Sequence, residues 1–413
     1  MTVTQQPDIR VLDAETYANG DPTTFGLPLD QYAWLRDNEP CFLQDFDDPM
    51  LIDRAWVVSR NADIWAVDRN AELYTTVRGG VNMWRVTPLD AEAGGKSATL
   101  TMDGDKHREE RAVMSKAFTP GFVRCLEEKF RGYAVNIVDE ALEKGTFNFV
   151  DDIGNAMPME AVGDVLGVPA GDRAKFFEWV DKFAAPFDTR ITASFDEVVL
   201  SIVNLFNYAD EFGDLERREP DDDVITQLVL TGADVTSDDE LRGNVALLAG
   251  GAAESTRTAL SHGMHELMRN PEQMAWLRAR ADDIPDSAIQ EIVRIASPFT
   301  HLVRTATTDH ELHGKEIKEN DKVLMHFAAG NFDERAFTDP NTFDLSREKN
   351  PHVSFGHGRH QFVGKHVASL EMKILLEELL RRTKTIEPAG DIVYVRDAYS
   401  RGVYQLPVTI TGA

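Results

Sequence analysis

The stretch Phe355–Ala368 constrains the fold of this 413-residue chain more than any other part of the sequence. It reads Phe-Gly-His-Gly-Arg-His-Gln-Phe-Val-Gly-Lys-His-Val-Ala, and its three glycines prevent a regular element from running through it. From Val363 to Leu375, apolar residues recur at helical spacing. A tight loop that runs directly into a helix is therefore predicted. Such a loop lets backbone approach a flat bound group, and the first helical turn directs free N–H groups toward it.

This loop resembles the haem-binding loop of the cytochrome P450 family, Phe-Gly-x-Gly-x-His-x-Cys-x-Gly-x-x-x-Ala. The resemblance places Phe355, Gly356, His360 and Gly364 beside the cofactor. One position departs from the pattern, because Phe362 stands where the family has the cysteine whose thiolate holds the iron. A phenylalanine has no lone pair and cannot ligate a metal. We therefore expect Phe362 to lie at the cofactor and the chain to offer no metal ligand there.

A long helix with a capping box at its start is predicted over residues 238–270. Its middle contains Gly250 and Gly251, each of which costs about 1 kcal/mol in helix propensity. Tight helix packing or a flat ligand beside the helix would each account for such small residues. The resemblance implies the ligand, with Ala249 and Gly250 next to the cofactor.

Glu254 and Ser255 follow on the same predicted helix. They resemble the acid–alcohol pair with which cytochrome P450 enzymes deliver protons to iron-bound oxygen, although the usual alcohol is threonine. Proton relay requires a titratable donor next to a rotating hydroxyl, and both groups are present. We take Glu254 and Ser255 as the candidate catalytic residues.

Glu291 and Arg294 lie one helical turn apart, on one face of a predicted helix. On a surface, such an ion pair contributes only about 0.3–0.5 kcal/mol. The resemblance implies instead the Glu-x-x-Arg motif of the family, which pairs with a later basic residue at the position of Arg347. Buried together, the three residues would have a structural role, because bidentate arginine pairs fix the backbone around them.

Four further residues match the contacts that the family makes to the haem propionates: His107, Arg111, Arg304 and His360. Each alone is better explained as a surface charge or a hydrogen-bonded core histidine. The resemblance implies that the four residues together bind a group with two negative charges, through charge-assisted hydrogen bonds.

The predicted fold is mainly α with a small β region, in a single large domain over residues 26–413 that follows an irregular segment over residues 1–25. Helical patterns dominate between His107 and Ile295, and strand-like pieces follow at His301–Ala306 and Val323–His326. No Pro/Gly/Ser-rich linker divides the chain. The resemblance implies the cytochrome P450 fold.

Composition excludes several classes of protein. The formal net charge of −27 disfavours binding to nucleic acid or to an anionic membrane surface. The sequence contains no apolar run of about 18 residues and no basic start followed by an apolar stretch. Its two cysteines, Cys41 and Cys125, suggest no disulfide framework. We expect a cytoplasmic protein.

In the family, the cysteine thiolate favours the O–O cleavage on which hydroxylation depends. Because this chain has no cysteine at that position, three functions remain open. The first is an oxidoreductase that holds haem b by its propionates, without a thiolate ligand, and in which ordinary monooxygenation is impaired. The second is a flavin oxidoreductase, with FMN stacked on Phe362 and its phosphate bound by the four cationic or imidazole residues. The third is a helper or scaffold protein without a cofactor.

The expected substrate is a hydrophobic small molecule, and the sequence near Glu254 is similar to that of bacterial members that oxidise steroids and terpenoids. Its pocket is expected to be lined by the broken stretch from Arg78 to Ala98, with Val81, Met83, Trp84 and Val86, and by Ala249 and Pro298–Leu302. A ferredoxin is the expected redox partner. The basic residues available for it near the glycine loop are Lys106, Arg108, Lys116, Arg359 and Lys365.

Overall fold

The computed structural model describes residues 8–48, 50–79, 81–84, 98–217, 223–231 and 234–413. Helices dominate it, as predicted. They are α1 (Ala14–Ala18), α2 (Leu29–Asn38), α3 (Asn61–Arg69), α5 (Gly104–Ser115), α6 (Pro120–Lys144), α7 (Ala156–Leu166), α8 (Ala170–Ala184), α9 (Phe195–Glu216), α10 (Val224–Thr226), α11 (Asp238–Arg269), α12 (Pro271–Arg278), α13 (Asp286–Ala296), α14 (Phe327–Asn331) and α15 (Lys365–Arg382).

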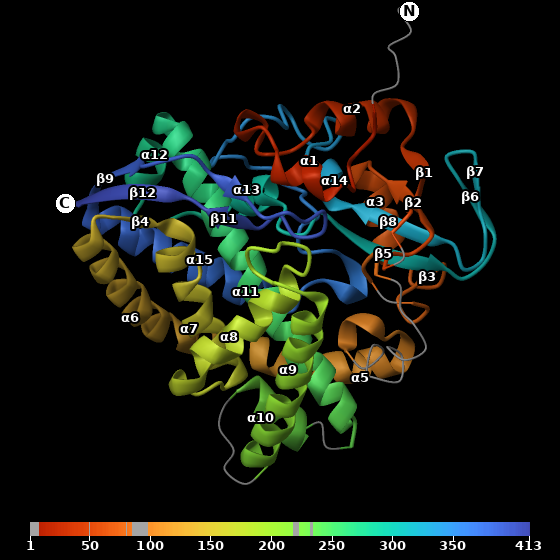
Figure 1. Cartoon of the computed structure of the whole chain (residues 1–413), viewed down its shortest axis with the longest axis horizontal. Helices are drawn as coiled ribbons and strands as arrows, with labels where there is room; N and C mark the ends of the chain where they lie inside the picture. The colour runs from red at the N-terminus through yellow and green to blue at the C-terminus, as the bar shows by residue number, and fades with distance from the viewer. Residues whose placement is uncertain (1–7, 49, 80, 85–97, 218–222, 232–233) are drawn as a thin grey trace, which may run out of the picture.

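Helix α11 is the central element of the fold. Figure 1 shows it in green, crossing the middle of the molecule between the helices α6–α9 and the strands near the N-terminus. Ser237 and Glu240 form the predicted capping box at its start. The helix packs against α7, α8, α9 and α13, and its middle and C-terminal half are largely buried. Because α11 is buried on several sides, the side chains of the neighbouring helices pack against it.

In the part of the chain that the structure describes, the small β region consists of four sheets. The largest has five strands in the order β1-β2-β8-β5-β3, in which only β2 and β8 are parallel. A second sheet has the order β4-β12-β9, and β6 pairs with β7 and β10 with β11. The strands are β1 (Cys41–Asp45), β2 (Arg54–Val58), β3 (Tyr74–Thr75), β4 (Thr146–Asn148), β5 (His301–Ala306), β6 (His310–Leu312), β7 (Lys315–Ile317), β8 (Lys322–His326), β9 (Thr383–Pro388), β10 (Val393–Tyr394), β11 (Val403–Gln405) and β12 (Pro407–Gly412).

The N-terminal segment is more regular than predicted. Within residues 1–25, which were expected to be irregular, α1 forms and is capped by Asp13. The Tyr17 hydroxyl donates to the carbonyl oxygen of Val11 at 2.6 Å and lies 2.9 Å from the hydroxyl of Tyr32 on α2. Five residues are too few for an apolar period to show in the sequence, so tertiary packing decides this helix.

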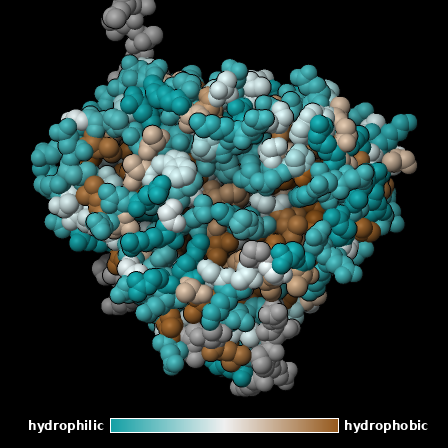
Figure 2. All heavy atoms as spheres, turned by 180° about the vertical axis from the view of Figure 1, so that it is seen from behind, coloured by the Kyte–Doolittle hydropathy of each residue, from teal (hydrophilic) through white to brown (hydrophobic). Residues whose placement is uncertain are grey.

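The molecular surface agrees with the acidic composition. Figure 2 shows hydrophilic residues over most of one face, with apolar residues in a few separate places. None of the helices in the described parts of the chain is long and apolar enough to cross a membrane.

Candidate functional site

The glycine loop adopts the predicted geometry. Gly356 and Gly358 have φ values of 64° and 67°, in the left-handed region that favours glycine. The amide of Phe362 donates to the carbonyl oxygen of Phe355 at 2.9 Å and closes the loop, and α15 begins at Lys365. The backbone therefore fixes where the side chain of residue 362 points.

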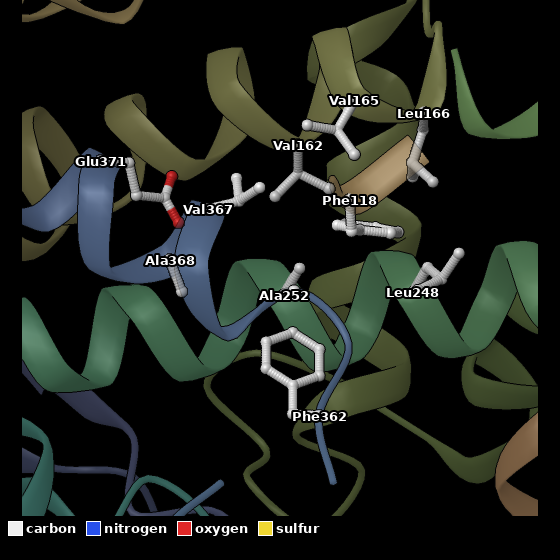
Figure 3. Close-up of a pocket in the computed structure, with 11 residues that line it drawn as sticks. Phe118, Val162, Val165, Leu166, Leu248, Ala252, Phe362, Val367, Ala368 and Glu371 are labelled. Carbon is white, nitrogen blue, oxygen red and sulfur yellow. The ribbon is translucent and has the colours of Figure 1, made fainter. Parts of the chain in front are cut away.

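The ring of Phe362 points toward α11 at Ala252 (Figure 3). It also lies over Gly364, because a Cβ atom placed there would be only 2.8 Å from its ring. Beside it is a mostly apolar cavity with about 20 Å³ of free space, room for about one water molecule. Its lining residues are Phe118, Val162, Val165, Leu166, Leu248, Ala252, Phe362, Gly364, Val367, Ala368 and Glu371.

Glu371 of α15 is the one ionisable residue that lines this cavity. Its side chain is buried, and its Oε1 accepts a hydrogen bond from Thr256 Oγ1 at 2.9 Å, while Oε2 has no hydrogen-bond partner in the described parts of the chain. Burial raises the pKa of the Glu371 carboxyl to about 8, which the Thr256 hydrogen bond only partly opposes. The group is therefore mostly protonated at neutral pH.

Two carboxylates of the chain lie against the residues that the resemblance assigned to propionates. Arg304 Nη2 donates to Asp68 Oδ1 at 2.7 Å, and both side chains are almost fully buried. His360 Nε2 lies 3.1 Å from Asp103 Oδ1. Burial opposes ionisation of Asp103, but hydrogen bonds from His360, Thr75 and the Thr76 amide outweigh it and hold the Asp103 pKa well below its usual range.

The structure also brings the other two residues of that group to the glycine loop. Arg111 donates to the carbonyl oxygen of Gln361, and the rings of His107 and His360 lie 4.4 Å apart. Burial, with the charges of His360 and Arg111, lowers the pKa of His107 to about 4. Its Nε2 is buried and has no hydrogen-bond partner within the described ranges. His107 is thus a neutral imidazole with one free polar atom.

Glu254 and Ser255 do not contact each other through their side chains. Ser255 Oγ donates back to the carbonyl oxygen of Gly251 at 2.7 Å. Glu254 is buried and accepts hydrogen bonds from Arg257, from Thr258 Oγ1 at 3.2 Å and from Ser400 Oγ at 2.9 Å. In this arrangement the carboxylate is held away from the hydroxyl to which a relay would pass a proton.

Helix packing accounts for one of the small residues in α11. A Cβ atom at Gly250 would lie 3.2 Å from Cε1 of Phe183 on α8, which is tighter than an ordinary contact. A Cβ atom at Gly251 would meet nothing within 4 Å. Ala249 is fully buried.

The structure brings Glu291, Arg294 and Arg347 together in the interior. Arg294 binds Glu291 through two nitrogens, each at 2.8 Å, and Arg347 Nε donates to Glu291 Oε2 at 3.0 Å. The two guanidinium groups also donate to backbone carbonyls of residues 331–342, including Pro340 at 2.8 Å and Thr338 at 2.7 Å. The irregular segment before the glycine loop is therefore held by charge-assisted hydrogen bonds.

Part of the predicted substrate region is described. Val81 and Met83 are buried, and Trp84 lies against Phe187 and Phe195, with ring centroids 5.4 and 5.7 Å apart. Val86 lies outside the described residues. On α9, Phe195, Val199 and Val203 recur every four residues and are exposed, so an apolar stripe continues from Trp84 along one face of that helix.

Two acidic residues of the site were missed by the sequence analysis. Asp68 lies in the last turn of α3, on the same buried side as Ile64, and Asp103 precedes α5. Neither belongs to a recognisable motif, and their basic partners are 236 and 257 residues away in the chain. A buried acid on the apolar side of the helix Asn61–Arg69 was the only signal available.

Comparisons with known proteins agree on one family. Residues 164–394 match the family model described as Cytochrome P450. The steroid C26-monooxygenase of Mycolicibacterium smegmatis is 31% identical over 395 residues, which cover 94% of this chain and 91% of the relative. A steroid C26-monooxygenase of Rhodococcus jostii is 30% identical, with 98% and 86% covered.

Solved structures agree with this match. The Mycobacterium marinum cytochrome P450 CYP268A2 in complex with pseudoionone superposes with a TM-score of 0.90 and 30% identity, over 99% of this chain and 100% of that chain. P450BioI in complex with an acyl carrier protein ligated with hexadec-9Z-enoic acid has a TM-score of 0.83 and 26% identity, with 94% and 99% covered.

Proposed function

This chain belongs to the cytochrome P450 family, and on that premise we propose that it binds a steroid- or lipid-like small molecule at the apolar region beside Trp84. The observation that carries the proposal is the 30–31% identity, over nearly the whole chain, to relatives named steroid C26-monooxygenases. The aromatic contacts of Trp84 and the exposed stripe on α9 support it, because a flat apolar molecule gains most from such surfaces.

The family implies haem, but the residues around Phe362 do not fit that group. Phe362 offers no ligand atom, and the free space beside it is about 20 Å³, whereas pockets for small ligands measure about 300–1,000 Å³. Three histidines of the loop region have other contacts, His352 with Gln290, His357 with Trp65 and His360 with Asp103, and the fourth, His366, is exposed. The proposed function is therefore binding, without thiolate–iron chemistry.

One observation favours a second candidate. His107 Nε2 is buried, has no hydrogen-bond partner among the described residues and lies in the same cluster as Arg111, Arg304 and His360. This free polar atom is compatible with an anionic group, and the second candidate is thus an oxidoreductase that holds haem b by its carboxylates without a thiolate. FMN has no such support, since Phe355 stacks on Phe362 at 6.3 Å and Gly364 lies under its ring.

Only the second candidate, the haem-containing oxidoreductase, requires a redox partner. Of the basic residues near the glycine loop, Lys106 already binds Glu110 and Glu240, and Arg108 binds Asp105. Lys116 and Arg359 are exposed, and Lys365 donates to Gln361. An acidic ferredoxin would therefore approach Lys116, Arg359 and Lys365.

A titration and an absorbance scan test these proposals. Purified protein, as isolated, is titrated with a steroid and with a fatty acid while tryptophan fluorescence is recorded. We expect saturable binding, weakened by about tenfold or more in Phe195→Glu, because a charge would face the apolar ligand. Leu215→Glu, at an exposed position near the other end of α9, should bind as the wild type does.

The outcomes separate the candidates. Saturable steroid or lipid binding with a featureless visible spectrum supports the proposed function. A sharp Soret band in the purified protein supports the haem-containing oxidoreductase, and paired bands in the blue and near ultraviolet would indicate a flavin. Failure to bind any of the apolar ligands would refute the proposed function.

A further inference from the structure

The glycine loop is held by the carboxylates of the chain itself. Asp68 accepts a hydrogen bond from the His357 amide at 2.6 Å as well as from Arg304. Asp103 accepts from the Thr76 amide at 2.8 Å and contacts His360. The two acids therefore connect α3, the segment before α5 and strand β5 to one face of the loop. The contacts with Arg304 and His360 use two of the four side chains that were predicted to bind an anionic group.

The two acids and the two arginines of this cluster balance in charge without a ligand. Asp68 and Asp103 supply two negative charges, and Arg304 and Arg111 supply two positive charges. Burial lowers the pKa of both imidazoles, that of His107 to about 4 and that of His360 in the same direction. A group that carries two further carboxylates would meet these acids at close range in a poorly solvated site. Like charges placed together in this way cost several kcal/mol.

We propose that this chain closes its own cofactor slot, with Asp68 and Asp103 in place of the two carboxylates of the group and the ring of Phe362 in the space between the loop and α11. The closure has two independent parts, one electrostatic and one steric. Restoring a cysteine at position 362 removes only the steric part. The proposal goes beyond ligand binding at Trp84 and does not depend on it.

Titration with haemin tests the proposal on the full chain. Absorbance reports the affinity and the stoichiometry, and carbon monoxide added after reduction reports thiolate ligation. We expect no stoichiometric binding by the wild type and weak binding by Phe362→Cys. Phe362→Cys with Asp103→Asn should bind haemin at least about tenfold more tightly than Phe362→Cys alone, because one repelling charge is gone. Addition of Asp68→Asn should strengthen binding again and give a thiolate–haem spectrum.

Two controls keep the result clear. Asp105→Asn removes an exposed acid two residues from Asp103, and its addition to Phe362→Cys should leave the haemin affinity unchanged. Asp68→Asn leaves Arg304 buried without its anion, so circular dichroism must show that each variant folds. If the Asp68 variant does not fold, the comparison of Phe362→Cys with and without Asp103→Asn decides the question.

Two results would overturn the proposal. One is a 1:1 complex of wild-type protein with haemin and a sharp Soret band. The other is equal haemin affinity of Phe362→Cys with and without Asp103→Asn. Steroid or lipid binding is measured without haemin, so a failure of the ligand-binding proposal is seen separately.

Discussion

Arg304 Nη2 lies 2.7 Å from Asp68 Oδ1, and both side chains are almost completely removed from water. Removal of one partner from such a pair leaves a buried charge, which typically costs about 3–5 kcal/mol. We predict a loss of this size in the free energy of unfolding for Asp68→Asn, measured by urea denaturation. The double variant Asp68→Asn with Arg304→Met should recover part of the loss, because no unpaired charge then remains.

An exposed ion pair provides the control for the double-mutant cycle at positions 68 and 304. Asp214 and Arg217 lie 2.7 Å apart with side chains that are 61% and 41% exposed. Asp214→Asn should change the free energy of unfolding by less than about 1 kcal/mol. A coupling energy near zero between positions 68 and 304 would mean that their contact contributes little to the folded state.

The ion-paired cluster of Glu291, Arg294 and Arg347 gives a second stability prediction. Glu291→Gln leaves two buried guanidinium groups without their carboxylate, and we expect a loss of about 3–5 kcal/mol. The released segment before the glycine loop should also lose protection in hydrogen exchange, because Arg294 and Arg347 bind its carbonyls. Asp105→Asn, at an exposed pair of the same i,i+3 spacing, should lose less than about 1 kcal/mol and leave this protection unchanged.

The sequence predicted those parts of the fold that depend on local patterns. Residues close together in the sequence are enough to predict three of these features. They are the loop and helix at Phe355–Leu375, the capping box of α11 and the strand His301–Ala306. The contact of Glu291 with Arg347 was anticipated because both matched spaced motifs. Such features need no knowledge of which distant segments meet.

The remainder depends on distant contacts that no local pattern contains. Asp68 contacts Arg304 and Asp103 contacts His360, although each pair is far apart in the sequence. Without these contacts, the sequence suggested that Arg304 and His360 were available to bind a cofactor. Gly250 is small because Phe183 approaches it from another helix. Glu254 and Ser255 are adjacent in sequence, but their side chains do not meet. Ser255 donates to the Gly251 carbonyl oxygen, and Glu254 accepts from Arg257.

The two glycines of α11 allow a direct comparison. Gly251→Ala adds a methyl group that meets nothing within 4 Å, so we expect a gain of about 0.5–1 kcal/mol from helix propensity. Gly250→Ala places its methyl group 3.2 Å from Phe183, so its gain should be smaller or absent. Thermal unfolding of both variants measures the difference. Phe183→Ala in the Gly250→Ala background should restore the gain, and equal stability of the two alanine variants would contradict the role of Phe183.

The pKa of Glu371 leads to a pH prediction. Burial raises this pKa from 4.5 to about 8 in the folded chain. Between these values the folded chain keeps the proton and the unfolded chain loses it, so the contribution to stability is complete below pH 4.5 and falls as pH rises through 8. The total loss is on the order of several kcal/mol, since each pKa unit corresponds to about 1.4 kcal/mol.

Glu371→Gln isolates this effect because the amide has a similar shape, has no charge at any pH and can still accept the hydrogen bond from Thr256. Urea denaturation at pH 5, 7 and 9 should show the variant gaining stability relative to the wild type as pH rises. Glu387→Gln, on the exposed side of β9, changes the same chemical group in contact with water, and its effect should not grow with pH. Parallel pH profiles of the wild type and Glu371→Gln would show that the Glu371 carboxyl ionises without cost, and hence that water reaches it beside Phe362.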